Sequence, residues 1–134
     1  MINEKELRTG NLYITLRNQI ITVSGIDTVN KFVIIASTSN TEITSKNESS
    51  IIFEDLNSIE ITEKNIAQLG FSTSDATMSI NLVSDNKFRF VWNEKLSQVF
   101  LVDEKDGAIG LQIKYIHQLQ NIFYDLSGKE LTLV

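Results

Sequence analysis

The sequence predicts a single α+β domain: two small antiparallel meanders, a short central helix and a C-terminal amphipathic helix that share one core. Three observations predict this class. Short apolar runs rich in β-branched and aromatic residues alternate with polar breaks in both halves of the chain. Two other stretches have helical spacing. The length of 134 residues fits one domain with one core.

The first part of this domain, residues 1–61, is predicted to be a small sheet. Its first three strands are separated by loops of hairpin length and turn-prone composition. Two further short strands would fold back on this meander, which allows a barrel-like closure. Residues 37–50 are rich in Ser, Thr and Asn, and predict a long mobile loop or a weak edge strand. The predicted strands are 12–16, 20–26, 32–36, 51–53 and 59–61.

Residues 62–71 predict the short central helix. Thr62 is suited to the N-cap position, and Gly70 to the left-handed residue that ends a helix. Ile66 and Leu69 lie three residues apart and form an apolar patch for docking on a sheet. The segment is therefore expected to be a structural bridge.

Residues 76–134 predict a second meander, with strands at 78–83, 88–92 and 98–102, and the final helix. In the middle strand Phe88, Phe90 and Trp92 share one face, which is a candidate platform for stacking bases or nucleotides. Aromatic residues in strands are usually core, however. The neighbouring basic residues fall on the opposite face, so both sets would not contact one ligand.

The final helix is predicted by apolar residues at three-and-four spacing, with Gly128 as its stop. The polar residues off this stripe are expected to face solvent, a neighbouring loop or a partner. His117, Asn121 and Tyr124 could form a polar cluster for a ligand, or His117 and Asn121 could tie the helix surface to nearby backbone carbonyls or loops. The apolar stripe consists of Tyr115, Ile116, Leu119, Ile122, Phe123 and Leu126. The candidate interaction or ligand surface consists of His117, Gln118, Gln120, Asn121 and Tyr124, with Asp125 also off the stripe.

Composition argues against several function classes. The chain has no Cys and one His, so thiolate chemistry and Cys-based metal sites are excluded. The acidic turn at 103–107 lacks the ligand alternation of a calcium loop because Lys105 interrupts it. No phosphate-binding Gly loop, nucleophile elbow or paired helical carboxylates are found. We therefore expect no metal, no cofactor and no catalytic residue.

Charge and hydropathy bear on partners and location. The net charge of −5 disfavours nucleic acid as a partner, because the protein's own field repels phosphates. The charged N-terminus lacks the apolar stretch of a signal peptide, and no run approaches the roughly 20 apolar residues of a membrane helix. A cytoplasmic protein without membrane contact is predicted.

Both ends of the chain carry motifs, Glu6-Leu7-Arg8-Thr9-Gly10-Asn11 and residues 113–121 (IKYIHQLQN). With Thr62-Glu63 through Leu69-Gly70-Phe71 and the closing Leu126 to Leu131, they resemble a family of small uncharacterised proteins of Bacteroidota and their phages and prophages. That family has an ELR-x-GN-type start and a KY-x-HQLQN-type C-terminal helix. The sequence departs from it at Thr9, at Phe123 and in the longer loop at 37–50. The resemblance implies an origin and a cellular compartment, and no activity.

Two function classes follow as hypotheses. The first is a non-enzymatic protein-interaction module of phage or mobile-element type, with an unknown protein partner and with homo-oligomerisation allowed. The second is a small-molecule binder, such as a protein that sequesters a nucleotide signal, with the aromatic strand or the cluster around His117 as its pocket. An enzyme would need a carboxylate pair that only the fold could assemble.

Overall fold

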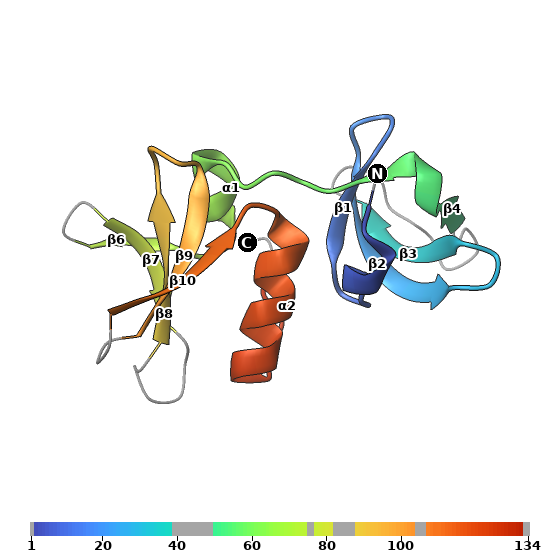
Figure 1. Cartoon of the computed structure of the whole chain (residues 1–134). Coiled ribbons are helices and arrows are strands. Elements are labelled where there is room, and N and C mark those ends of the chain that lie inside the picture. Colours follow the sequence, from blue (N-terminus) through green and yellow to red (C-terminus); the bar gives the residue numbers. More distant parts are fainter. Residues whose placement is uncertain (1, 39–49, 75–76, 82–87, 104–106, 133–134) are drawn as a thin grey trace. The chain divides into compact units, whose positions relative to one another are not determined.

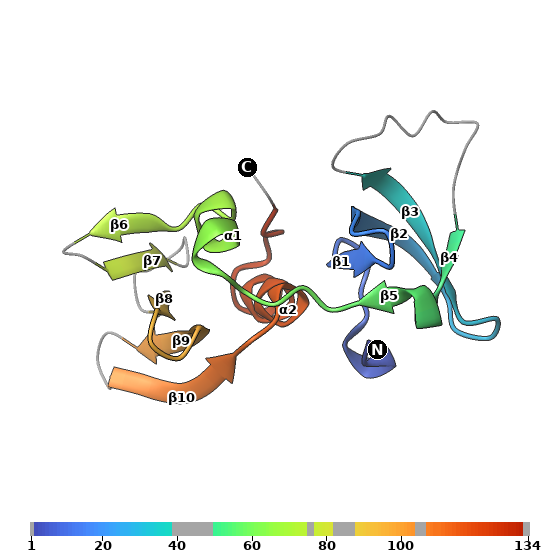
Figure 2. The same cartoon turned by 90° about the horizontal axis from the view of Figure 1, so that it is seen from above.

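The chain has the predicted α+β class and divides into two compact units. A computed structural model describes residues 2–38, 50–74, 77–81, 88–103 and 107–132. The first unit is Met1–Ile59 and the second is Glu60–Val134. Each unit contains one five-stranded antiparallel sheet (Figures 1 and 2). That both sheets belong to a single domain around one core stays a prediction.

The sheet of the first unit has the strand order β4-β3-β2-β1-β5. Strands β1, β2 and β3 are neighbours and form the predicted meander. The 3₁₀ turn η2 links β4 to β5. The elements are η1 (Glu4–Glu6), β1 (Leu12–Thr15), β2 (Ile20–Asp27), β3 (Phe32–Thr38), β4 (Ser50–Ile52), η2 (Phe53–Asp55) and β5 (Leu56–Asn57).

Two predictions for this sheet are wrong. The last strand is β5 rather than 59–61, because Leu56 is the fully buried residue that pairs with Thr15 of β1. Ile61 instead donates its N–H to the carbonyl of Lys114 in the second unit, at 2.9 Å. Among the described strands the order is linear, with β4 and β5 at the two edges, so they form no closed barrel.

The core of the first unit lies on one face of this sheet. Side chains from four strands, the N-terminus and η2 contribute to it, and Leu7, Ile26 and Ile51 pack against it half-buried. Alternation along the strands places these residues on one side. The buried cluster is Ile2, Tyr13, Ile21, Val23, Val33, Ile35, Phe53 and Leu56.

The sheet of the second unit has the order β10-β9-β8-β7-β6. Strands β6 and β10 escaped prediction. The first consists only of Ser and Thr, while Gly107, Gly110 and a register shift between Ala108 and Gln112 obscure the alternation of the second. The elements are α1 (Glu63–Gln68), β6 (Ser72–Ser74), β7 (Thr77–Asn81), β8 (Phe88–Asn93), β9 (Gln98–Asp103), β10 (Gly107–Ile113) and α2 (Ile116–Ser127).

Helix α1 has both of the ends that the sequence predicts, and α2 has the predicted end at Gly128, whereas Tyr115, expected in the apolar stripe, is the N-cap of α2. The Thr62 hydroxyl accepts from the Asn65 N–H, and the Asn65 side chain accepts from the Thr62 N–H, so each stabilises the start of α1. Gly128 ends α2 in the left-handed conformation with φ of 73°. In Figure 1, α2 lies beside the sheet, and the Phe123 ring centroid is 6.1 Å from that of Phe90 in β8.

Three predicted segments lie wholly or partly outside the residues that the structure describes. They are most of the polar loop at 37–50, the turn at 84–87 and the centre of the acidic turn at 103–107. Within the described ranges, no helix is long and apolar enough to span a membrane.

Candidate functional site

The polar residues of α2 do not form the exposed surface that the sequence predicts. His117 and Gln120 are buried, with 1% and 0% of their surface exposed. Gln118 and Asn121 are half-buried, and only Tyr124 is exposed. His117 and Gln120 therefore do not face solvent; of the three environments expected, solvent, a neighbouring loop or a partner, Gln120 faces a neighbouring segment of the chain.

The chain after α2 explains this burial. The Gln120 Nε2 donates to the carbonyl of Leu131 at 2.9 Å, and the Leu131 side chain is itself buried. A buried amide needs such a partner, because an unsatisfied polar group costs about 1–3 kcal/mol. Gln120 therefore holds the segment after α2 in place, a structural role that the sequence suggested for His117 and Asn121 rather than for Gln120.

The start of α2 uses two more residues of the C-terminal motif. The Gln118 Oε1 accepts from the Tyr115 N–H at 3.3 Å, and so caps the helix. The rings of Tyr115 and His117 stack with centroids 5.9 Å apart and an interplanar angle of 19°. Lys114 Nζ lies 5.5 Å from the Tyr115 ring centroid and 3.8 Å from Glu60 Oε1. The motif thus stabilises the fold of the second unit.

The predicted aromatic platform is also largely internal. Phe90 is completely buried, and Trp92 is 9% exposed. The side chain of Phe88 lies outside the described residues. A base could not stack on Phe90 without displacing Phe123 of α2, so the strand serves as core.

The N-terminal motif has a structural role in the first unit. Asn11 is fully buried, and its Oδ1 accepts from the Arg8 N–H at 2.9 Å. Gly10 has φ of 90°, a conformation that favours Gly, and its N–H donates to the Val23 carbonyl at 2.7 Å. The Val23 N–H in turn donates to the Asn11 carbonyl at 3.0 Å. The pair Gly10-Asn11 therefore fixes the entry of the chain into β1.

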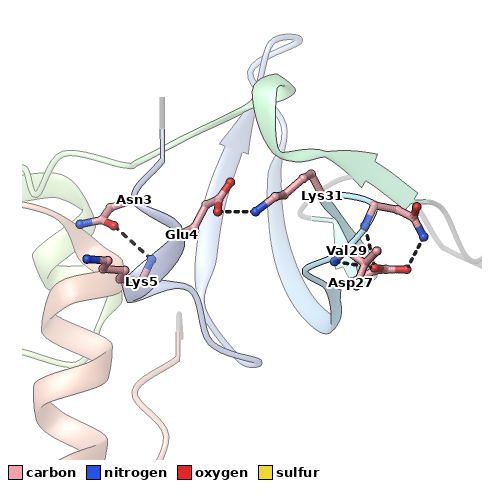
Figure 3. A network of polar contacts seen from close by, with 7 residues as sticks. Asn3, Glu4, Lys5, Asp27, Val29 and Lys31 are labelled. Atoms are coloured by element: carbon pink, nitrogen blue, oxygen red, sulfur yellow. Dashed lines mark hydrogen bonds and ion pairs between the residues drawn. The ribbon is translucent and has the colours of Figure 1, made fainter.

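The tip of the β2–β3 hairpin is a hydrogen-bonded turn built around Asp27 (Figure 3). The Asp27 carboxylate accepts from the N–H groups of Val29 and Asn30, at 3.0 and 2.9 Å, and from the Asn30 Nδ2 at 3.1 Å. The hydrogen bonds from Asn30 and then Val29 lower the pKa of Asp27 below its usual value, so the carboxylate stays ionised. Val29 stands at this tip with 86% of its surface exposed.

Lys31 ties the hairpin tip to two other parts of the first unit. Its Nζ is 2.8 Å from the Glu4 Oε2, whose helical turn η1 begins at the Asn3 cap (Figure 3). Its carbonyl accepts from the Phe53 N–H at 2.9 Å. Lys31 adopts φ of 60°, a left-handed conformation. These contacts give the tip a defined shape despite its exposure.

A half-exposed apolar patch lies on the sheet face opposite the core of the first unit. We call Phe32, Ile34 and Ile52 the outer-face patch. The strand register places Asp27, Phe32 and Ile52 side by side in one row across the sheet. The following row holds Ile26, Val33 and Ile51, and the row after that holds Gly25, Ile34 and Ser50. Since Val33 and Ile51 between these rows face the core, the patch must face away from it.

The side chains of this patch are ordered by their neighbours. A Cβ at Gly25 would come within 3.3 Å of Ile34 Cδ1, so the Ile34 side chain rests on the bare backbone of Gly25. Phe32 and Ile34 are half-buried, whereas Ile52 is 49% exposed on the edge strand β4. Exposed apolar groups gathered on one face are typical of interaction surfaces.

Sequence reasoning missed this patch, although a signal was present. Residues 32–35 are apolar without interruption, which is typical of a strand that is covered on both faces. Only one face of β3 carries the buried cluster. The unbroken run therefore indicates that β3 is apolar on both faces, of which this unit's core covers only one.

The described residues hold no arrangement for metal chemistry. In these ranges no three His, Asp or Glu side chains come together as metal ligands. Compared with known proteins, the chain matches no family model, no curated protein and no solved structure. The family resemblance of its end motifs thus stays a prediction.

Proposed function

We propose that this protein is a non-enzymatic protein-interaction module of phage or mobile-element type that acts in the bacterial cytoplasm. The observation that supports this function is the outer-face patch beside the hydrogen-bonded hairpin tip. Ile52 and Val29 leave 49% and 86% of their surfaces exposed, as does Leu16 of the β1–β2 turn with 66%, but only Ile52 adjoins further apolar side chains, Phe32 and Ile34, on the same sheet face. Burying such side chains against a partner is the main driving force of association.

The acidic composition favours a protein over a nucleic acid as this partner. The origin and the compartment rest on the end motifs, which resemble those of the Bacteroidota and phage family. The contact is assigned to the outer-face patch rather than to α2, because His117 and Gln120 are buried in the second unit.

A capture experiment with matched variants tests this function. Wild-type protein, Ile52→Asp and Leu16→Asp would be immobilised and exposed to a Bacteroidota cell extract with chemical cross-linking. Leu16 is a suitable control because it is an exposed apolar residue of the β1–β2 turn, at 66%. We expect one partner to be retained by wild type and Leu16→Asp and lost by Ile52→Asp.

Circular dichroism on all three proteins would establish that the fold is retained. Capture that is insensitive to Ile52→Asp, or equally lost in both variants, would contradict the assignment of the contact to this patch.

One observation favours a second candidate function, the binding of a small molecule. The Trp92 Nε1 is buried and finds no hydrogen-bond acceptor among the described residues. A buried donor of this kind costs about 1–3 kcal/mol unless an acceptor reaches it. Native mass spectrometry of freshly purified protein tests this function: a defined retained mass that Trp92→Phe abolishes would favour it, and a bare chain mass would count against it.

A further inference from the structure

We propose that the β4 edge of the first unit binds an extended, basic segment of a partner protein, which adds to the sheet as a further strand. This inference rests on the proposed interaction function and names the chemistry of its partner. Three features of the described residues carry it: a strand edge, an apolar face and a surplus of acidic charge.

The first feature is the edge itself. Ser50–Ile52 pairs with β3 on one side, and no described strand lies on its other side. An edge strand offers backbone N–H and carbonyl groups to an incoming strand. Natural edges are often protected by Lys or Pro, and β4 has neither. An extended segment is therefore the partner shape that this edge fits.

The second feature is the apolar face next to the edge. Ile52 belongs to β4 itself, and Phe32 and Ile34 continue its surface across β3. A strand added to β4 projects alternate side chains onto the same face, where they meet Ile52. Apolar residues at every second position of the partner would extend the outer-face patch.

The third feature is charge. Glu54 and Asp55 follow β4 directly, in the turn η2. Lys31 does not balance them, since its Nζ is paired with Glu4 at 2.8 Å. The local excess is thus negative, and a segment with Lys or Arg between its apolar residues complements it.

The same charges disfavour a second copy of this chain at the edge. A parallel pairing of two β4 strands would place the two sets of Glu54 and Asp55 side by side, and in an antiparallel pairing two chains of net charge −5 would still repel each other. Like charges placed together at an interface oppose association. The partner is therefore a different, basic chain.

Binding of short synthetic peptides tests this inference. Fluorescein-labelled KVTVKVT, with blocked ends, would be titrated with the full chain and followed by anisotropy at low salt, beside the acidic counterpart EVTVEVT. We expect the basic peptide to bind and the acidic one to bind at least about tenfold more weakly. Ile52→Asp, and separately Glu54→Lys with Asp55→Lys, should each weaken the basic peptide about tenfold or more.

Two controls separate strand addition from other modes. The basic peptide with a methylated central backbone nitrogen keeps its charge but loses a donor, so it should bind about tenfold more weakly if it pairs as a strand. Leu16→Asp should leave affinity within about twofold, because this residue lies in the β1–β2 turn rather than on β4.

The outcomes distinguish this inference from the function beneath it. Equal binding of both peptides, no binding of the basic peptide, or indifference to Ile52→Asp overturns strand addition of a basic segment. If capture of a partner from extract still depends on Ile52 in that case, the interaction function stands and only the partner's chemistry is wrong. If capture also ignores Ile52, both are overturned.

Discussion

The sheet of the second unit carries α2 beside it, and the rings of Phe90 and Phe123 meet at 6.1 Å. The sheet of the first unit has no α-helix among its described residues, and its second face keeps the half-exposed Phe32, Ile34 and Ile52. Both β3 and β8 are rich in apolar side chains. The comparison teaches that an apolar strand face can be covered by a helix of the same unit or can stay half-exposed.

The largest expected effect comes from weakening the packing of α2 on the sheet of the second unit. Phe123→Ala should lower the free energy of unfolding by about 3–5 kcal/mol, because it removes a buried ring from the core. Urea unfolding followed by the fluorescence of Trp92, the single Trp of the chain, measures it. Tyr124→Ala, at the adjacent exposed position, should change stability by about 0.5 kcal/mol or less. Equal losses in the two variants would refute this account of α2.

The next effect concerns the buried amide in each unit. Gln120→Ala should cost about 1–3 kcal/mol, because the Leu131 carbonyl loses its donor. Amide hydrogen exchange at residues 129–132 should accelerate in this variant. The exposed Gln112→Ala is the matched control, and it should leave both quantities unchanged.

The counterpart in the first unit is Asn11. Asn11→Ala should cost about 1–3 kcal/mol, because the Arg8 N–H loses its acceptor at the entry to β1. Chemical denaturation followed by circular dichroism measures this loss. Thr9→Ala changes an exposed side chain in the same turn and should be nearly silent. If both changes were silent, the N-terminal motif would not be structural.

Alkaline pH should affect the first unit through Tyr13. Burial, and to a lesser degree the nearby Glu6, raise the pKa of this phenol above its usual value of 10.0. A folded-state pKa above the unfolded one means that stability is complete below pH 10 and falls as pH rises beyond it. Tyr13→Phe should remove this part of the alkaline loss, as thermal unfolding across the alkaline range would reveal. An unchanged pH dependence in the variant would contradict it.

The smallest expected effect sharpens the comparison at neighbouring positions of β4. Ile51→Val should cost about 0.5–1.5 kcal/mol, because Ile51 packs against the core cluster. Ile52→Val should change stability by about 0.5 kcal/mol or less, because the side chain lies on the other face and is half-exposed. Urea midpoints of the two variants test this difference. Similar losses at both positions would show that the outer-face patch is part of the core.

Much of the fold was predictable because its strongest patterns are local. The alternation around β2, β8 and β9 corresponds to one buried face, and Ile116, Leu119 and Phe123 of the predicted α2 stripe are buried, whereas its Leu126 is 44% exposed. Strands β6 and β10 were not predictable, because polar or Gly-containing strands owe their place to neighbouring strands rather than to their own composition. The sequence predicts the fifth strand at 59–61 rather than at β5, because two Ile residues there are a stronger local signal than the single Leu56.

The candidate site was predicted less well than the fold. A polar residue off an apolar stripe normally faces solvent, and Gln120 breaks this rule only because the distant Leu131 returns over it. No helical periodicity contains that information. To predict the outer-face patch one must likewise know which face of β3 packs against the core, and that depends on the fold of the whole unit.

The pairing of Ile61 with Lys114 has a consequence for how such a gene can be rearranged. Glu60 bridges to Tyr115 and Ile61 bonds to Lys114, so the first residues of the second unit are already part of its hydrogen-bonded structure. A recombination event between the codons for Ile59 and Glu60 would exchange the first sheet whole and leave these bonds in place. One between Ile61 and Thr62 would leave the same backbone bonds to the incoming residues, which any residue except Pro can donate, but it would replace the buried Ile61 side chain of the second unit.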